Sequence, residues 1–423
     1  SKYKGDVANC AEAVKEHLLK AGCDLAEVCP TAGHPIVYGE KIVDASLPTV
    51  LVYGHYDVQP VDPVNLWTNP PFEPTLKNGI IYARGSADNK GQILAHVMGV
   101  KEYLQKNKEL PVNLTFLIEG EEEVGSPNLR PFLEKHKADL PCDVIVISDT
   151  GMVGPGIPTL TYGLRGITCL EVQITGPKMD LHSGVFGGAV LNPLLALTKL
   201  MSTFHDAEGK VMVEGFYKGV ADIAPWEKES WAKLGDPDQE VRDLTGVKKT
   251  FGENGFTPRE RTWARPTLEF NGVGGGYQGE GSKTVIPSKA FVKISCRLVP
   301  NQNPKEVTAA VKKHIEKHMP REVSFEIIDQ HDGQPYMADP FTNWGKAAQS
   351  ALKKTFGKDT VFIREGGSIP IVQDFKQVLG ADTLLLGLAL PDCRAHSPDE
   401  NYPVENFEKG IQLCQNLLDE LAK

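Results

Sequence analysis

The sequence of 423 residues has no long apolar segments, no basic stretches and no closely paired cysteines. No apolar run approaches the roughly 18 residues that a membrane span needs, and runs such as PTVLVY and VIVI are of strand length. The net charge of −10 argues against a nucleic-acid partner, because binding a polyanion needs a concentrated basic face. We therefore expect neither a membrane nor a nucleic acid as a partner.

The eight cysteines include no C-x-x-C pair, so the sequence has neither a zinc-ribbon nor a dithiol redox motif. Scattered cysteines in a chain of this length are most simply reduced and buried, and no signal peptide is visible. We therefore expect a cytoplasmic protein. The length predicts two or three domains, and the 41% hydrophobic content is ordinary for a globular protein.

The first third of the chain alternates helical and strand patterns. Apolar spacing predicts helices over 7–22 and 91–107, and near-continuous apolar runs predict strands over 49–54, 112–120 and 142–150. Such strands between amphipathic helices favour an α/β fold, with a mostly parallel mixed sheet covered by helices on both faces.

The middle of the chain has a different order, strand-helix-strand-strand-helix-strand, which is typical of a small two-layer α/β module. A polar stretch over 205–264 interrupts it and is too long to be an idle turn. Helix-strand alternation then resumes to the C-terminus. We therefore predict one domain from residues 1–163 and 333–423, with a second domain, 164–332, inserted into it.

Polar residues of one chemical type follow the predicted strands. In parallel sheets such residues gather beyond the carboxyl ends of the strands. The stretch LIEGEEEVGS alone would read as a solvated turn, but four further strand or loop ends carry only imidazole and carboxylate. The residues concerned are His55, Asp57, Asp88, Glu121, Glu122, Glu123, Asp149 and His396.

Buried carboxylates so close together would repel one another unless cations neutralise them. Two divalent ions would balance three carboxylates and a bridging hydroxide, with two neutral imidazoles completing the ligand shells. Mixed His, Asp and Glu ligation suits zinc or manganese. We predict two divalent metal ions per subunit, Zn or Mn.

Nine motifs resemble those of the dinuclear metallopeptidases that include carnosinase-like cytosolic dipeptidases, glutamate carboxypeptidases and succinyl-diaminopimelate desuccinylase. The motifs occur in the family's order across nearly the whole chain, and the likeness is greatest to the cytosolic non-specific dipeptidase branch. Related chains have more residues before the position of His55, so we expect this N-terminus to be trimmed or incomplete. The motifs are GHYDVQP, RGSADNKGQ, EGEEEVGS, ISD, MDLHSGVFGG, SKTVIP, CRLVPNQNP, EGGSIP and AHSPDE.

The resemblance implies a role for each residue of the predicted metal site. Asp88 would bridge both ions and precede a cis peptide bond to Asn89, Asp57 would orient an imidazole, and Glu122 would be the general base. An aspartate rather than a glutamate at position 149 resembles the ligand found in the aminopeptidase and dipeptidase branches more than that of the carboxypeptidase branch. The ligands of one ion would be completed by His55 and Asp149, and those of the other by Glu123 and His396.

The resemblance also implies how substrate is held. His182 would stabilise the oxyanion from the partner subunit, and Arg297 would bind the substrate's C-terminal carboxylate. The inserted domain would act as a lid and dimerisation domain in a homodimer, closing around a dipeptide. Further contacts around the substrate's termini are implied for Thr284, Glu365, Gly367 and Ser368.

Alternatives remain for the reaction and for two other motifs. A related amidohydrolase could remove an acyl group from an N-acyl amino acid or amine, or act as a glutamate carboxypeptidase does; a third alternative is a non-catalytic relative that keeps the fold. The glycine-rich 272–284 lacks the Gly-Lys-Ser/Thr ending of a phosphate-binding loop. His314 and His318 stand four residues apart, and their basic neighbours predict a solvated helix face rather than a metal pair.

Overall fold

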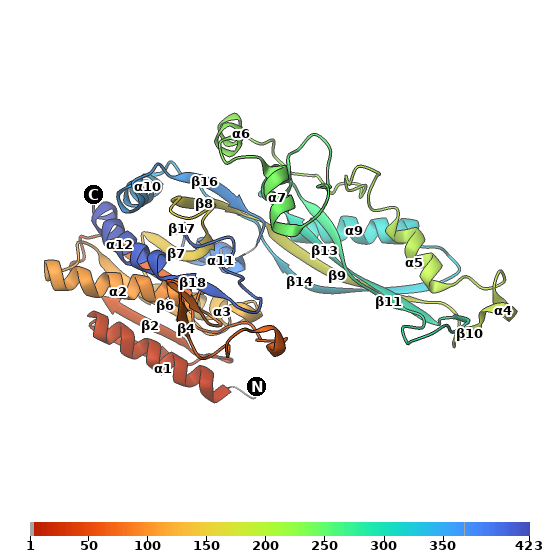
Figure 1. Ribbon diagram of the computed structural model, residues 1–423, viewed down its shortest axis with the longest axis horizontal. Helices are drawn as coiled ribbons and strands as arrows, with labels where there is room; N and C mark the ends of the chain where they lie inside the picture. The colour runs from red at the N-terminus through yellow and green to blue at the C-terminus, as the bar shows by residue number, and fades with distance from the viewer. Residues whose placement is uncertain (1–3, 368) are drawn as a thin grey trace. The chain divides into compact units, whose positions relative to one another are not determined.

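A computed structural model describes residues 4–367 and 369–423 and divides into two compact units (Figure 1). The first comprises Ser1–Tyr162, Ala338–Ile363 and Ile371–Lys423, and the second comprises Gly163–Met337 and Arg364–Pro370. The second unit thus includes residues 333–337 and 364–370, which the predicted boundaries assign to the first domain.

The first unit is built on a mixed sheet whose central strands are parallel. Strand β3 pairs in parallel with β6 and β7, and β7 pairs in parallel with β17, while β1, β2 and β8 add antiparallel pairs. The predicted α/β class with a mixed sheet flanked by helices is confirmed. In sheet order the strands are β1 (Leu25–Cys29), β2 (Ile36–Lys41), β6 (Asn113–Glu119), β3 (Thr49–His55), β7 (Val144–Gly151), β17 (Asp382–Ala389) and β8 (Thr159–Leu164).

Helices cover both faces of this sheet because its strands are apolar on both sides. On one face of β3, Val50 and Val52 join the core beneath α1, α2, α10 and α12. On the other face, the Tyr53 ring packs edge-to-face on Phe375 of α11, with 5.2 Å between the ring centroids. The helices are α1 (Lys4–Ala21), α2 (Lys90–Asn107), α3 (Leu129–His136), α10 (Asn343–Phe356), α11 (Pro370–Val378) and α12 (Val404–Leu421).

Two glycines let α2 and α12 lie side by side. A Cβ atom on Gly99 would lie 2.5 Å from the Cβ of Cys414, and one on Gly410 would lie 2.8 Å from the Cβ of Ala95. The close packing fixes α2, whose N-terminus follows the loop of Asp88. Smaller elements of this unit are β4 (Thr75–Lys77), β5 (Ile80–Tyr82) and β18 (Asn401–Pro403), which form a three-stranded sheet. Strand β16 (Val361–Glu365) pairs with β8, and its last two residues belong to the second unit.

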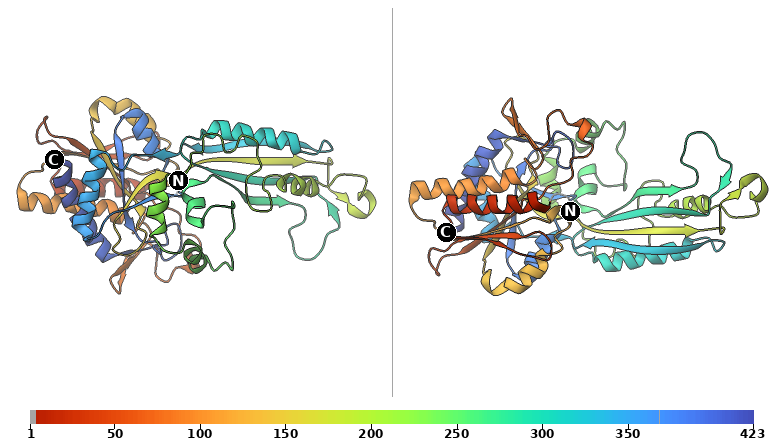
Figure 2. Two further views of the ribbon diagram at one scale, coloured as in Figure 1. Left: turned by 90° about the horizontal axis from the view of Figure 1, so that it is seen from above. Right: turned by 90° about the horizontal axis from the view of Figure 1, so that it is seen from below.

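The second unit is a two-layer α/β module, in which helices α5 and α9 pack on a four-stranded antiparallel sheet (Figure 2). In β13 buried and exposed residues largely alternate, so one face meets a core that includes Val292, Leu197 and Val311. In sheet order the strands are β11 (Thr267–Gly275), β13 (Lys289–Leu298), β9 (Gly166–Thr175) and β14 (Ser324–Gly333), with helices α5 (Pro193–Met201) and α9 (Pro304–His318).

The interrupting stretch 205–264 contains three short helices that the sequence reasoning did not identify. Each begins with proline at its first position, and Asp236 and Thr257 cap two of them with side-chain oxygens. That Asp-Pro and Thr-Pro signal was available in the sequence. The helices are α6 (Pro225–Ala232), α7 (Pro237–Thr245) and α8 (Pro258–Ala264); α4 (Ser183–Phe186), β10 (Leu181–His182), β12 (Val285–Ile286) and β15 (Tyr336–Met337) complete the unit.

His314 does not lie on a solvated helix face, so that prediction was wrong for it. Its ring is 7% exposed, lies 2.8 Å from the Thr203 hydroxyl through Nε2, and packs against Phe204. The reason is that the apolar face of α9 includes position 314, which turns toward the sheet.

All eight cysteines are without a disulfide bond, as predicted, but only Cys23, Cys296 and Cys414 are fully buried and the other five are half-buried. Among the described residues no helix combines the length and apolar character of a membrane span.

Candidate metal centre

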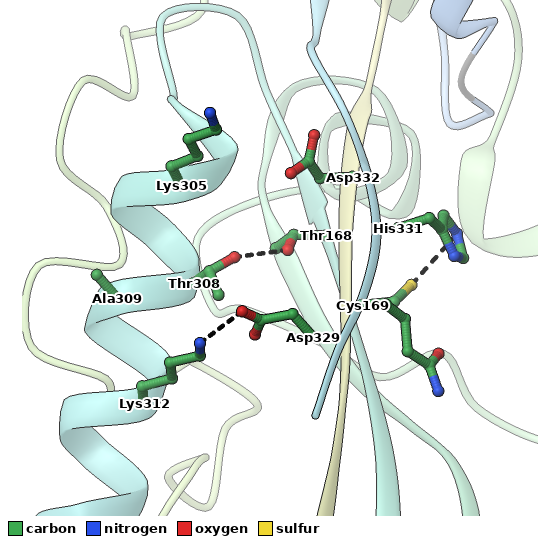
Figure 3. A pocket seen from close by; sticks show the side chains of 10 residues that line it. Thr168, Cys169, Lys305, Thr308, Ala309, Lys312, Asp329, His331 and Asp332 are labelled. Carbon is green, nitrogen blue, oxygen red and sulfur yellow. Dashed lines mark hydrogen bonds and ion pairs between the residues drawn. The ribbon is translucent and has the colours of Figure 1, made fainter. Parts of the chain in front are cut away.

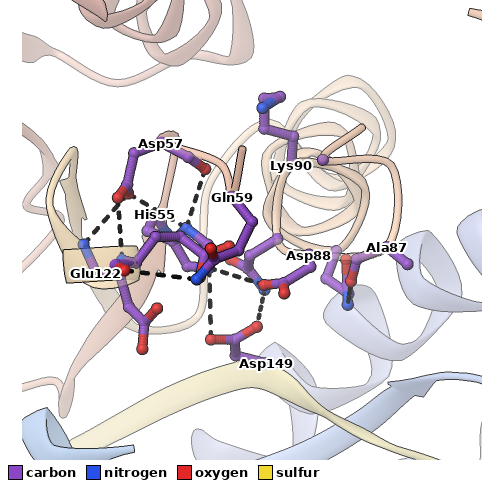
Figure 4. A network of polar contacts seen from close by, with 12 residues as sticks. His55, Asp57, Gln59, Ala87, Asp88, Lys90, Glu122 and Asp149 are labelled. Carbon is purple, nitrogen blue, oxygen red and sulfur yellow. Dashed lines mark hydrogen bonds and ion pairs between the residues drawn. The ribbon is translucent and has the colours of Figure 1, made fainter. Parts of the chain in front are cut away.

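Three side chains converge where strands β3 and β7 approach their carboxyl ends (Figure 4). His55 is the last residue of β3, Asp149 lies near the end of β7, and Asp88 comes from the loop before α2. The Nε2 atom of the fully buried His55 lies 3.1 Å from Asp88 Oδ1 and 3.6 Å from Asp149 Oδ2. Because β3 and β7 are parallel neighbours, their ends deliver these ligand atoms to one edge of the sheet.

A second group of three lies against the other oxygen of Asp88. His396 Nε2 is 2.8 Å from Asp88 Oδ2 and 3.3 Å from Glu123 Oε2. In each group of three, one ligand atom per residue lies within 4.8 Å of the others. Asp88 therefore offers one carboxylate oxygen to each group, which is the arrangement that a bridging ligand needs.

The clustered carboxylates of Asp88, Asp149 and Glu123 would repel one another unless cations lay between them. Hydrogen bonds that His396 donates to the carboxylates of Asp88 and then Glu123 raise the pKa of its imidazole to about 10. Burial raises the pKa of Asp149 to about 6, and the neighbouring carboxylates of Asp88 and Glu123 add to that effect. The donor set of imidazole nitrogens and carboxylate oxygens fits two Zn²⁺ or Mn²⁺ ions, which would take the place of the imidazole protons.

Asp57 ties His55 to the turn that carries Glu122 and Glu123. Its Oδ1 lies 3.3 Å from His55 Nδ1, and its two oxygens accept hydrogen bonds from the backbone N–H groups of Glu122 (3.3 Å) and Glu123 (3.0 Å). Gly125, at φ 88°, closes this short 3-10 turn. One carboxylate thus orients the imidazole and the two adjacent glutamates.

Glu122 lies beside the metal-ligand groups but belongs to neither (Figure 4). Burial, and then the charge of Asp149, raise the pKa of its carboxyl to about 8. Its neighbour Glu123 is instead held by Gln59, whose amide donates to Glu123 Oε2 at 2.7 Å. Adjacent glutamates therefore have separate surroundings.

The cis peptide bond between Asp88 and Asn89 is confirmed. Asn89 links the two strand ends, since its Oδ1 accepts from the backbone N–H of His55 at 3.3 Å and its Nδ2 donates to Asp149 Oδ1 at 3.0 Å. Sequence reasoning assigned Asn89 no contact of this kind.

Glu400 is a further residue that the sequence reasoning missed. It is fully buried, and Oε1 accepts from the backbone N–H groups of Ala87 (2.9 Å) and Asp88 (3.0 Å). Its Oε2 accepts from the guanidinium of Arg84 at 2.7 Å and from the N–H of Gly85 at 2.9 Å. The one signal for Glu400 was its place in AHSPDE, four residues after His396.

Glu119 and Glu121 are buried, although the stretch LIEGEEEVGS on its own reads as a solvated turn. Glu119 is the last residue of β6, is 2% exposed, and accepts hydrogen bonds from Tyr53 (2.6 Å) and Ser126 (2.7 Å). Glu121 is 8% exposed and accepts from the amide of Asn128. The chain stays buried past the strand end, so each carboxylate needs a hydrogen-bond donor.

The predicted substrate residues lie in two places in the second unit. His182 and Thr284 are neighbours at the β10–β12 ribbon, where the backbone N–H of Ser183 donates to the Thr284 carbonyl at 3.1 Å. Arg297 lies near the far end of β13. Glu365 ends β16, Gly367 is exposed, and Ser368 lies outside the described residues.

A hollow of about 300 Å³ lies elsewhere in the second unit, between α9 and strands β9 and β14 (Figure 3). Four of its polar side chains pair with one another: Lys312 with Asp329 at 2.6 Å, and the hydroxyls of Thr168 and Thr308 at 2.6 Å. It contains none of the predicted site residues, and we assign it no part in the chemistry.

The fold and the paired ligand groups are those of a metal-dependent peptidase, and comparison with known proteins agrees. Residues 51–420 match the model of peptidase family M20/M25/M40, and the chain belongs to that family. The chain is 36% identical over 387 residues to the Cys-Gly metallodipeptidase DUG1 of Saccharomyces cerevisiae, covering 89% of this chain and 80% of that protein. It is 32% identical over 394 residues to the human Beta-Ala-His dipeptidase, covering 92% and 78%.

Among solved structures, the chain is similar to an M20 family metallo-carboxypeptidase, Sso-CP2, from Sulfolobus solfataricus. The TM-score is 0.87 at 35% identity, covering 97% of this chain and 93% of that one. The family resemblance inferred from the nine motifs is therefore confirmed.

Proposed function

We propose that this member of the peptidase family hydrolyses the peptide bond of dipeptides at two divalent metal ions, Zn or Mn. His55, Asp88 and Asp149 would hold one ion, and Asp88, Glu123 and His396 the other. The observation that carries the proposal is that the two oxygens of Asp88 face two separate groups of ligand atoms. The dipeptidase relatives support the substrate class.

When bound, the two ions supply Lewis acidity that polarises the peptide carbonyl and acidifies the attacking water. Glu122 takes a proton from that water and passes it to the leaving amine. The backbone N–H groups of Glu122 and Glu123 both donate to Asp57, so one carboxylate positions the base and the adjacent metal ligand. Asp57 also keeps the His55 ring oriented for ligation through Nε2.

The second unit supplies the groups that hold the substrate in this proposal. Arg297 binds the C-terminal carboxylate with its planar fork, and Glu365, Gly367 and Ser368 contact the substrate's ends. Thr284 also contacts the substrate, and because it lies beside His182 it acts from the same subunit as that histidine. The first unit is then the catalytic domain and the second the lid and dimerisation domain. The eight unpaired cysteines support a cytoplasmic location.

His182 acts from the partner subunit of a homodimer in this proposal, and the dimensions of the second unit support that. The ribbon of His182 joins the start of β13, while Arg297 lies eight residues further along the strand, about 26 Å at ~3.3 Å per residue. A dipeptide spans only about 7 Å. This separation exceeds the length of a dipeptide several-fold, which favours a second copy of the chain as the source of His182.

A related acyl-removing or carboxypeptidase activity is the second candidate, since the similar Sulfolobus protein is named a carboxypeptidase. The decisive assay uses metal-free protein reconstituted separately with Zn²⁺ and Mn²⁺. It compares free dipeptides, N-acylated dipeptides and longer peptides. Cleavage of free dipeptides is the expected result, and cleavage of the N-acylated set alone would contradict the proposal.

A further inference from the structure

Arg165, at the junction of β8 and β9, has one buried guanidinium nitrogen with no hydrogen-bond acceptor among the described residues. Its Nε donates to the carbonyl of Gly366 at 3.0 Å, and its backbone N–H donates to the carbonyl of Glu365 at 3.2 Å. Its Nη1 atom is buried, and no described residue accepts a hydrogen bond from it. Arg165 is thus held to Glu365 and Gly366 by its backbone N–H and its Nε atom, while its Nη1 atom remains without an acceptor among the described residues.

A second arginine lies on the neighbouring strand, because Arg297 of β13 pairs with Ile167 of β9, two residues from Arg165. Burial, and then the charge of Arg297, lower the pKa of Arg165 to about 10, and Glu269 only partly offsets them. Two like charges in a desolvated place repel, and a buried unpaired N–H costs free energy. A carboxylate between the two guanidiniums would relieve both penalties, because it accepts several hydrogen bonds and carries the opposite charge.

We propose that Arg165 is a second guanidinium of the site that binds the substrate's C-terminal carboxylate, and that with Arg297 it makes the enzyme selective for substrates with a free carboxylate. The assignment rests on the proposed function for the role of Arg297. It adds a residue that no motif singled out. Arg165 approaches the substrate site from the β8–β9 junction, and Arg297 from β13.

Gly366 leaves the space that this arrangement needs. A Cβ atom at position 366 would lie 2.8 Å from Arg165 Nη2 and 3.2 Å from the carbonyl oxygen of Thr262. A methyl group there would therefore displace the guanidinium without removing its charge. Gly366→Ala tests position, and Arg165→Met tests charge and hydrogen bonding together.

The test compares kcat/KM for a dipeptide and for the same dipeptide with a C-terminal amide. The wild type should prefer the free acid, and Arg165→Met should reduce that preference by about 10- to 100-fold, mainly through KM. Gly366→Ala should reduce it in the same direction. The matched control is Lys293→Met, which removes one positive charge from the same strand as Arg297, about 13 Å away, and should leave the preference unchanged.

Equal loss on the acid and the amide in Arg165→Met would overturn the proposal, because it would mark a purely structural role. Arg165→Lys keeps the positive charge but lacks the planar guanidinium, and it replaces the methionine variant in the assay if that variant does not fold. It should reduce the preference by a smaller factor, and an unchanged preference would again overturn the proposal.

A binding experiment separates this proposal from the proposed function. Isothermal titration uses a reduced dipeptide, with CH2–NH in place of the peptide amide, as the free acid and as the C-terminal amide. Tighter binding of the acid that is lost in Arg165→Met supports the carboxylate site even if the wild type cleaves no dipeptide. Equal binding of both probes by the wild type would overturn it even if dipeptides are cleaved.

Discussion

Glu400 accepts a hydrogen bond from the backbone N–H of Asp88 at 3.0 Å, although 312 residues separate them in the chain. The same carboxylate accepts three more hydrogen bonds, from Arg84, Gly85 and Ala87. It therefore shapes the whole loop that presents Asp88 to both ligand groups. Glu400 is a positioning residue, since each of its two oxygens already accepts two hydrogen bonds from residues 84–88.

Glu400→Gln should weaken metal binding without removing a ligand. The new amide NH2 would face N–H donors, so the loop would shift and metal affinity would fall by about 10- to 100-fold. Titration of the metal-free protein with Zn²⁺ measures this. The control is Glu420→Gln, which replaces a carboxylate on α12 that pairs with Lys423 at 2.7 Å. Unchanged affinity in Glu400→Gln would rule out the positioning role.

Glu122→Ala should keep both metal ions and lose turnover by about 10²- to 10⁴-fold, because it removes the base and leaves the ligands. Glu123→Ala is the informative comparison, since the adjacent residue should instead lose one ion. Elemental analysis and initial rates on the same samples decide between them. Near-full activity in Glu122→Ala would show that another group takes the proton.

Asp88→Ala should bind neither ion firmly, whereas His396→Ala should retain about one per subunit. The reason is that Asp88 lies in both groups of ligand atoms and His396 in only one. Metal content after dialysis against a weak chelator measures the difference. Equal metal content in the two variants would contradict the bridging role.

His96 should make the protein less stable as the pH falls. It is 2% exposed, lies 2.8 Å from the Ser148 hydroxyl through Nε2, and burial lowers its pKa to about 4. The unfolded chain binds this proton from about pH 6.5 downward and the folded chain only near pH 4. Stability is therefore full above pH 6.5 and falls by about 3 kcal/mol as the pH drops to 4.

His96→Phe should lack that part of the pH dependence. Urea unfolding at pH 7 and at pH 4.5 measures the difference, with His17→Gln on the exposed face of α1 as the control. An acid-induced loss of stability that is equal in wild type and His96→Phe would exclude His96 as its source.

Much of the fold was predictable because the strand signals were strong. Runs such as VIVI are apolar on both faces, as parallel strands between two helical layers must be, and their polar ends mark one sheet edge. The three helices of 205–264 were missed because they are short and polar, and only their Asp-Pro and Thr-Pro starts marked them. His314 was misjudged because charged neighbours on a helix say little about the face on which a residue lies.

The sequence by itself determined the family, the α/β class and the set of imidazole and carboxylate groups, because ordered motifs and apolar periodicity are local properties of the chain. Only the tertiary structure decided which oxygen of Asp88 faces which ligand group, and that Glu400 supports the Asp88 loop. It also decided that the buried Nη1 atom of Arg165 has no acceptor among the described residues and that Arg297 lies on the strand beside it. These relations join residues far apart in the sequence through hydrogen bonds and charge. Such contacts produce no periodic pattern in the sequence from which they could be predicted.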